Sequence, residues 1–203
     1  MALRAFASEN PQNFVAQMAL ARALRKEQQT DEAVQALERA AALVSVSRGA
    51  ESPHAQLAAI ALEKNDRRRA ISELQALVAV DFDNIAAARQ LAGLLRDAGV
   101  SDQATLRPVY ERIAAIDPFD PEVHGMLGRL AMQRNEPDTA AREFRAVVAL
   151  GPVDRAAALT DLAESYLKGG KRAEAKKETL AALEIAPSYE RAQELLLQLV
   201  ARP

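Results

Sequence analysis

An internal repeat of about 35 residues is the feature that most constrains how this chain folds. A leucine followed by a small residue recurs at Leu20, Leu57, Leu91, Leu127 and Leu162. A second marker, which opens an amphipathic run later in each period, recurs in the same phase at Ala33, Ala70, Leu106, Ala140 and Ala175. Two markers in phase predict an array of stacked units, each of which buries its apolar face against its neighbours.

Each period is predicted to hold two helices. Apolar residues follow helical spacing in the first run, and no segment alternates with the period of two that a strand needs. Ser52-Pro53 and Asp120-Pro121 place a capping side chain before a first-turn proline, which indicates a helix start. Prolines such as Pro152 and Pro187 follow the second run, where they end the helix. The chain is therefore predicted to be all-α, built from antiparallel helix–turn–helix units.

These residues resemble the tetratricopeptide repeat, whose signature is W-x2-L-G-x2-Y, then A-x3-F, then P. The fourth unit has His124-x2-Leu127-Gly128-x2-Ala131, Ala140-x3-Phe144 and Pro152. The fifth has Leu159-x2-Leu162-Ala163-x2-Tyr166, Ala175-x3-Thr179 and Pro187. The resemblance implies a right-handed α-solenoid of about five repeats that serves as a non-catalytic scaffold for protein–protein interaction. The third unit departs from the pattern, because Leu106 and Pro108 predict a second helix that starts late.

The repeat markers give the expected boundaries. The solenoid is predicted over residues 12–187, with repeats at 12–47, 48–83, 84–118, 119–152 and 153–187, and a capping helix at 188–203. Residues 1–11 are expected to be a partial helix of a preceding repeat or an N-terminal extension. Leu3 and Phe6 are its apolar residues; they form either an exposed edge through which the chain forms a homo-oligomer or a short helix folded back on the first repeat.

Composition narrows the function classes. The 26 Lys and Arg residues nearly balance the 28 Asp and Glu residues, so composition gives no argument for nucleic-acid binding. The chain has no cysteine, so it has no thiol nucleophile, zinc–thiolate site or iron–sulfur cluster. No apolar run has the length of a signal peptide core or a membrane span. We therefore expect no metal, no cofactor, no nucleic acid and a cytoplasmic location.

Candidate catalytic groups are few. His54 and His124 occupy the same slot two repeats apart, roughly 20 Å by typical helix spacing, which is too far to share a metal ion. We interpret both as packing residues. Residues 81–84 and 117–120 have aspartates at calcium-loop spacing but lack the glycine and the distal glutamate, so we interpret them as helix caps. The basic turns at 67–69 and 168–172 are interpreted as solvated. The sequence predicts no enzyme.

The resemblance also implies a concave groove, lined by the first helices, that binds an extended or helical peptide. The groove positions are Met18, Arg22, Arg25, Ala55, Gln56, Ala59, Arg89, Gln90, Arg96, Met126, Arg129, Met132, Asp161 and Glu164. Their arginines favour a partner with acidic residues, because guanidinium groups make forked contacts with carboxylates. The alternative is that these arginines pair with acidic residues of adjacent repeats and leave the groove solvated.

Two other functions stay open. The chain is either an accessory repeat domain of a larger enzyme or of a secretion or assembly protein, or it is a self-assembling solenoid. The second alternative would use the Leu3 and Phe6 edge.

Overall fold

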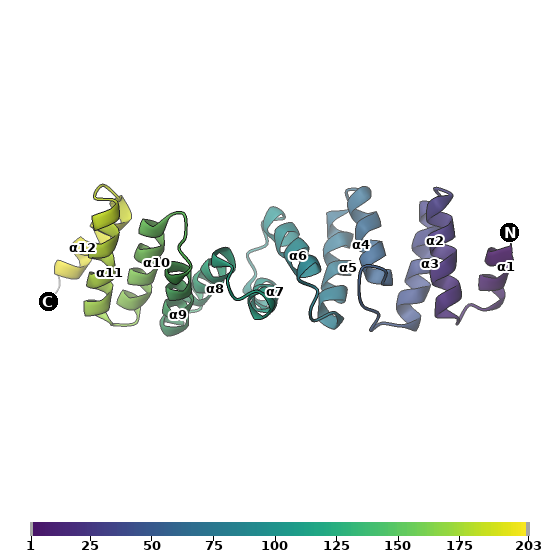
Figure 1. The fold of residues 1–203 in the computed structure, drawn as a ribbon, viewed down its shortest axis with the longest axis horizontal. Coiled ribbons are helices and arrows are strands. Elements are labelled where there is room, and N and C mark those ends of the chain that lie inside the picture. The colour runs from purple at the N-terminus through teal and green to yellow at the C-terminus, as the bar shows by residue number, and fades with distance from the viewer. Residues whose placement is uncertain (1, 202–203) are drawn as a thin grey trace. The chain divides into compact units, whose positions relative to one another are not determined.

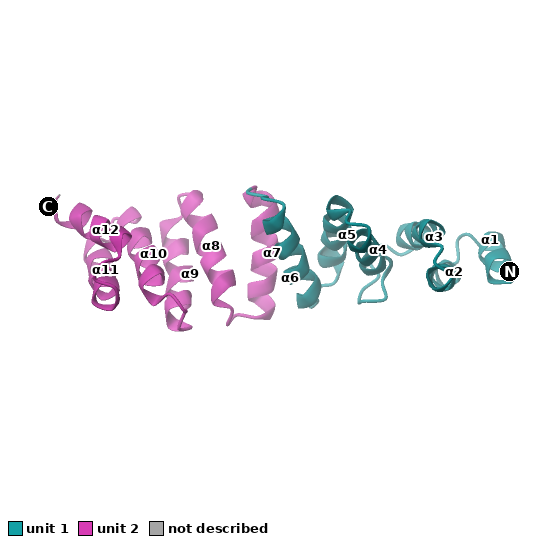
Figure 2. Cartoon of the chain, turned by 90° about the horizontal axis from the view of Figure 1, so that it is seen from above, with its two compact units in different colours: residues 1–101 teal, residues 102–203 magenta. Residues whose placement is uncertain are grey.

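The computed structural model describes residues 2–201, and twelve α-helices account for most of them (Figure 1). These residues contain no strand. They form two compact units that meet in sequence between Ser101 and Asp102 (Figure 2). The all-helical class predicted from the repeat is confirmed.

Unit 1 holds six helices, and each packs on the next in the chain. They are α1 (Ala2–Glu9), α2 (Phe14–Lys26), α3 (Thr30–Leu43), α4 (Pro53–Glu63), α5 (Arg67–Val80) and α6 (Ile85–Asp97). Unit 2 holds α7 (Gln103–Ile116), α8 (Pro121–Gln133), α9 (Pro137–Ala149), α10 (Arg155–Lys168), α11 (Arg172–Ile185) and α12 (Glu190–Val200). Its helices also pack in chain order, and α12 touches α10 as well. Short connections make successive helices antiparallel, so each unit is a short α-solenoid.

The helix pairs can be placed against the predicted repeats. The pairs α2–α3, α4–α5, α8–α9 and α10–α11 each lie inside one predicted repeat range. The two helices of the predicted range 84–118, α6 and α7, belong to different units. The repeat boundaries themselves stay predictions.

The turn inside each helix pair uses one backbone device. The second residue after the helix has a positive φ: 61° at Gln28, 57° at Asn65, 67° at Gly99, 61° at Asn135 and 76° at Gly170. The next amide then donates to a carbonyl five residues back, as Asp66 N does to Ala61 O at 2.8 Å. This closes the helix and reverses the chain. Glycine, which adopts this conformation without steric cost, occupies the position at Gly99 and Gly170.

Side-chain caps start the first helices. The side chains of Asn13, Ser52, Asn84, Asp120 and Asp154 accept hydrogen bonds from backbone amides in the first turns of α2, α4, α6, α8 and α10. The predicted starts at Ser52-Pro53 and Asp120-Pro121 are confirmed. Asn84 and Asp120 come from the two calcium-like segments, and capping accounts for these two side chains.

The late start predicted for the second helix of the third repeat is wrong. The helix α7 begins at Gln103, because the Asp102 carboxylate accepts hydrogen bonds from the amides of Ala104 and Thr105. Pro108 lies inside α7. Proline removes one helical hydrogen bond, here the one to the Ala104 carbonyl, and the cap together with the buried Leu106, Val109 and Ile113 holds the helix in place.

The repeat markers form the core. In the leucine–small pairs, the small residue is buried, as Ala21 and Ala163 are. The second helix packs a large side chain against it. At Gly128 this approach is so close that an added Cβ would lie 2.5 Å from a ring carbon of Phe144. The glycine of the repeat signature is therefore required here by packing.

Candidate partner-binding grooves

The groove residues predicted in unit 1 lie on α2, α4 and α6. On α2, Met18 is half-buried against the core of that end, while Arg22 is exposed. On α4, Ala55 and Gln56 are half-buried and Ala59 is exposed. Ion pairs connect α2 to α4 and to the loop before it.

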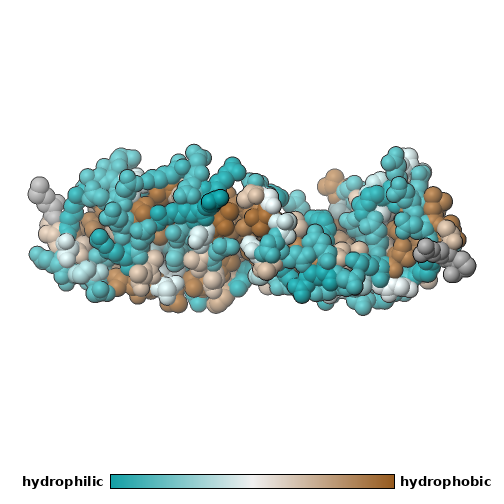
Figure 3. All heavy atoms as spheres, turned by 180° about the vertical axis from the view of Figure 1, so that it is seen from behind, coloured by the Kyte–Doolittle hydropathy of each residue, from teal (hydrophilic) through white to brown (hydrophobic). Residues whose placement is uncertain are grey.

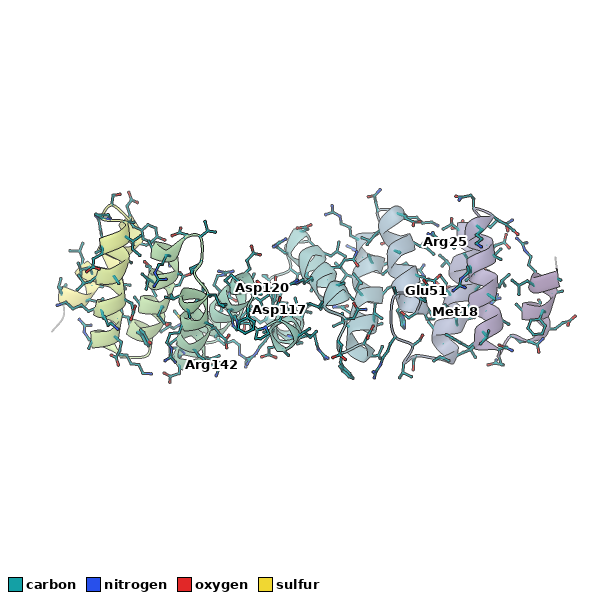
Figure 4. All side chains as sticks on the ribbon, in the orientation of Figure 1. Met18, Arg25, Glu51, Asp117, Asp120 and Arg142 are labelled. Carbon is teal, nitrogen blue, oxygen red and sulfur yellow. The ribbon has the colours of Figure 1, made fainter. Side chains whose placement is uncertain are left out.

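The arginines on α2 already have carboxylate partners. Arg25 donates to both oxygens of Glu63, at 2.7 and 2.8 Å. Arg22 donates to Glu51 at 3.0 Å, and Figure 4 labels Met18, Arg25 and Glu51 in this region. The hydrogen bond from Arg25 holds the pKa of the Glu63 carboxyl below its ordinary value. For α2, the contacts match the alternative in which groove arginines pair with acids of the next repeat.

The remaining predicted groove residues of unit 1 lie on α6. Arg89, Gln90 and Arg96 are exposed there, and Arg96 approaches Asp97 of its own helix at 3.9 Å. Gly93, one residue past the leucine–small pair, has open space where a Cβ would stand. The surface of α6 is therefore polar, with small residues between the charged ones.

A groove lies in unit 2, along α8, α10 and α12. A cavity of about 350 Å³ opens there, with Met132, Leu167 and Leu195 as its apolar lining. Polar residues complete it: Glu164, Lys168, Arg191, Glu194 and Gln198. The sequence predicted Met132 and Glu164 at this site. It missed the α12 residues, although α12 lies one period after α10 and so occupies a first-helix slot.

Two of the predicted groove residues, Asp161 and Glu164, share one cationic partner. A single guanidinium, that of Arg191, donates to Asp161 at 2.8 Å and to Glu164 at 2.9 Å. Burial lowers the pKa of Arg191, but these two hydrogen bonds outweigh it and raise the pKa overall. Lys168 is also engaged, since its Nζ donates to the backbone carbonyl of Met132 at 2.7 Å. The two cations that line the cavity, Arg191 and Lys168, therefore already have partners within unit 2.

Arg129, a predicted groove residue on α8, is not among the residues that line this cavity. It is exposed on α8 and makes no ion pair with any residue from 2 to 201. Its guanidinium lies over Gly125, 3.4 Å from where a Cβ would stand. Met126, half-buried on the same helix, and Met132 flank it in sequence. A cation without a carboxylate therefore stands beside adaptable apolar side chains.

Each histidine contacts a glutamate on the other helix of its pair. His54 Nδ1 lies 2.8 Å from Glu73, and His124 Nδ1 lies 2.8 Å from Glu143. His124 Nε2 also approaches the Pro118 carbonyl at 2.9 Å. Burial lowers the pKa of His124, yet the bonds to Glu143 and Pro118 raise it above its ordinary value overall. Within residues 2–201, no three His, Cys, Asp or Glu side chains gather where a metal ion could bind.

The N-terminal edge is a helix that packs on α2. Ala7 of α1 is buried, and the buried Gln17 amide donates to the Ala7 carbonyl at 3.1 Å. Leu3 is half-buried, and Phe6 keeps 49% of its surface exposed. The short helix packs on α2 of the first repeat, while Phe6 stays at the surface. None of the helices in the described part of the chain is long and apolar enough to cross a membrane.

The paired helices, the left-handed turns and the grooves along the first helices define a helical-repeat protein of the scaffold type. Family models for the tetratricopeptide repeat match residues 15–43 and 126–190. The two matched segments are tetratricopeptide repeats, and members of this family generally act as scaffolds for protein–protein interaction. The family predicted from the repeat signature is confirmed.

Solved structures share the fold at low identity. YrrB, described as a tetratricopeptide-repeat protein with an unusual peptide-binding site, matches with a TM-score of 0.54 and 18% identity over 96% of this chain and 97% of its own. MamA matches with a TM-score of 0.51 and 18% identity, over 87% and 92% of the two chains. PilF of Pseudomonas aeruginosa matches with a TM-score of 0.51 and 17% identity, over 97% and 86%. A comparison with curated protein sequences gives no match.

Proposed function

We propose that this chain is a non-catalytic scaffold that binds a partner peptide in the groove of unit 2. The cavity along α8, α10 and α12 supports this, because it offers the apolar lining of Met132, Leu167 and Leu195. Such a cavity takes one or two apolar side chains of a peptide. The peptide-binding site described for YrrB, which has a similar fold, is in line with the proposal.

The acidic character of the partner rests on Arg129. Arg22 already contacts Glu51, Arg25 contacts Glu63, and Arg191 contacts Asp161 and Glu164. Arg129 is exposed and without such a contact, so a partner carboxylate would gain an ion pair without displacing one. The favoured ligand is therefore a peptide with an apolar anchor and a carboxylate near it.

The test uses a labelled peptide of about 12 residues with two leucines flanked by aspartates, read by fluorescence anisotropy with the full chain. We expect binding that Arg129→Glu weakens by about tenfold or more, since a carboxylate contact becomes a repulsion. The control is Arg145→Glu, which makes the same charge change on an exposed position of the second helix α9. Equal affinity for both variants would contradict the proposal.

Self-association is a second candidate, favoured by Phe6. Counted back from the cap of the next helix, Phe6 occupies the slot of Leu77 and Val147, which are 2% and 8% exposed. Phe6 is 49% exposed, so a second copy of the chain would bury it. Sedimentation velocity over a range of concentrations checks this: Phe6→Ser should shift the chain toward monomer, and Leu180→Ser, on α11, should not. A wild-type mass that stays monomeric at every concentration would exclude it.

An accessory role in a larger protein and a cytoplasmic location stay predictions from the sequence. The absence of a nucleic-acid partner is likewise a prediction, based on the nearly balanced charge.

A further inference from the structure

The loops that connect one helix pair to the next carry exposed apolar side chains. In unit 2, these loops and the helix ends beside them form one edge, made of residues 116–122, 149–155 and 184–191, which we call the inter-repeat edge. Phe119 is 75% exposed, Val153 is fully exposed and Ile185 is 52% exposed. All three lie on this edge because successive helices of the unit are antiparallel.

The turns inside the helix pairs of unit 2 carry no such exposed apolar side chains. Residues 133–139 and 167–174, which hold the turns inside the helix pairs, include no large hydrophobic residue that is exposed. Unit 1 repeats the pattern by itself, since Val46 and Phe82 are exposed in its inter-repeat loops. Single exposed hydrophobic residues are normal on a protein, and others such as Leu180 and Leu197 lie on helices. Among the described residues, however, those that lie between helices are all found in the loops that connect one helix pair to the next. Figure 3 shows apolar side chains reaching the surface of the molecule on one face.

The loops present these side chains on a fixed backbone. The Asp117 carboxylate accepts a hydrogen bond from the amide of Phe119 at 3.2 Å, and Asp120 caps α8 directly after it (Figure 4). Next to Val153, Gly151 has φ 71° and Asp154 caps α10. Because these turns are already ordered, little conformational entropy would be lost on binding.

The charge of the edge indicates the chemistry of a partner. The inter-repeat edge of unit 2 holds six carboxylates, namely Asp117, Asp120, Glu122, Asp154, Glu184 and Glu190. It holds two cations, Arg155 and Arg191, and Arg191 is bound to Asp161 and Glu164. An apolar surface among carboxylates fits a cationic partner and repels an anionic lipid surface.

The spacing indicates the shape of the partner. Phe119 and Val153 stand in successive inter-repeat loops, and stacked helices are spaced by about 10 Å. An α-helix rises 1.5 Å per residue, so apolar side chains about seven residues apart would reach both. We propose that the inter-repeat edge of unit 2 docks a basic amphipathic helix of a partner protein. Its apolar residues cover Phe119 and Val153, and its lysines and arginines meet the surrounding carboxylates. Arg191 is the one described residue that this surface shares with the lining of the groove cavity, and the proposal does not depend on the function proposed for the groove.

The test measures binding of a labelled leucine–lysine helical peptide of about 18 residues, with leucines at heptad spacing, to the full chain. Fluorescence anisotropy gives the affinity, and amide chemical shifts in NMR spectra give the location. We expect Phe119→Ser/Val153→Ser to weaken binding by about tenfold or more, because the apolar contact is lost. The matched control is Leu180→Ser/Leu197→Ser, which removes two exposed leucines of unit 2 outside the edge. Circular dichroism checks that both variants keep their helices.

Several outcomes would overturn the proposal. Equal weakening by the two double variants would show unspecific apolar binding. Equal affinity for a leucine–glutamate peptide of the same pattern would remove the role of the carboxylates. A change in affinity with Arg129→Glu, with no effect of Phe119→Ser/Val153→Ser, would move the peptide into the groove. Binding of phosphatidylserine vesicles that Phe119→Ser/Val153→Ser abolishes, without binding of the leucine–lysine peptide, would assign the edge to a membrane.

Discussion

At Gly128, a single hydrogen atom in place of a methyl group allows α8 and α9 to approach. A Cβ there would stand 2.5 Å from a carbon of the Phe144 ring, which is 3% exposed and held by its neighbours. We expect Gly128→Ala to lower the free energy of unfolding by about 1–3 kcal/mol through overpacking. Urea unfolding followed by circular dichroism measures it. Gly93→Ala is the control; it has open space and should gain up to about 1 kcal/mol from helix propensity. Equal effects at the two glycines would refute this account.

His124 should make stability depend on pH. The bonds to Glu143 and Pro118, and the nearby Asp120, outweigh burial and raise its folded-state pKa above 6.5. Folding therefore favours the charged imidazole, so its contribution is fully present below about pH 6.5 and is lost as pH rises through the raised pKa. Denaturation at pH 6 and pH 8.5 checks this, and we expect His124→Gln to remove the wild-type decline. A decline of the same size in the variant would assign the pH dependence to other groups.

At the residue scale, the sequence predicts contacts between neighbours in the chain and misses those between repeats. The caps at Ser52 and Asp120 followed from residues a few positions apart. The pair Arg25–Glu63 joins residues 38 positions apart, so it depends on the packing distance between helices. For the same reason, the sequence predicted the positions of Arg22 and Arg25 but did not identify Glu51 and Glu63 as the residues that they contact.

At the element scale, α7 tolerates a proline that weakens it. Pro108 is exposed in the helix interior, and its ring nitrogen cannot donate to the Ala104 carbonyl. We expect Pro108→Ala to raise the free energy of unfolding by about 1–3 kcal/mol, because a hydrogen bond is gained and no packing is lost. Thermal unfolding measures it. Pro137→Ala serves as the control, since Pro137 opens α9, where no helical bond is missing. A gain at Pro137 as large as that at Pro108 would contradict the prediction.

Most of the helices could be predicted because each signals its own ends. Capping side chains, left-handed turn residues and prolines after the second helix are all local signals. The start of α7 was mispredicted because proline was given more weight than the cap at Asp102. The role of α12 in the groove was missed because its place there depends on packing against α10 and α11.

At the scale of the whole molecule, each helix contacts its chain neighbours within its own unit, so the effect of a core substitution should stay local. We expect Phe144→Ala to leave a cavity that costs about 3–5 kcal/mol and to speed hydrogen exchange in α8 to α10. Exchange in α2 to α5 should keep its wild-type rate. Hydrogen exchange read by mass spectrometry tests this, with Leu74→Ala in unit 1 as the mirror-image control. Uniform acceleration along the chain by either variant would show that the molecule unfolds as one cooperative unit.

The repeat array and its family could be predicted at this scale because the period of about 35 residues is visible throughout the chain. The division into two units could not, because Ser101 and Asp102 lie inside a predicted repeat and neither residue type marks a boundary. The exposed apolar residues of the inter-repeat loops, such as Phe119 and Val153, were not predicted either, because the repeat pattern does not place loop side chains.

The left-handed turns offer a way to engineer the chain. The same backbone position is occupied by glycine at Gly99 and Gly170, by asparagine at Asn65 and Asn135, and by glutamine at Gln28. A side chain in this conformation costs about 1–2 kcal/mol that glycine avoids. The five turns therefore differ in the conformational free energy that their positive-φ residue costs. Exchanging these residues among the turns would tune the thermal tolerance of each helix pair separately, with the groove and the inter-repeat edge unaltered.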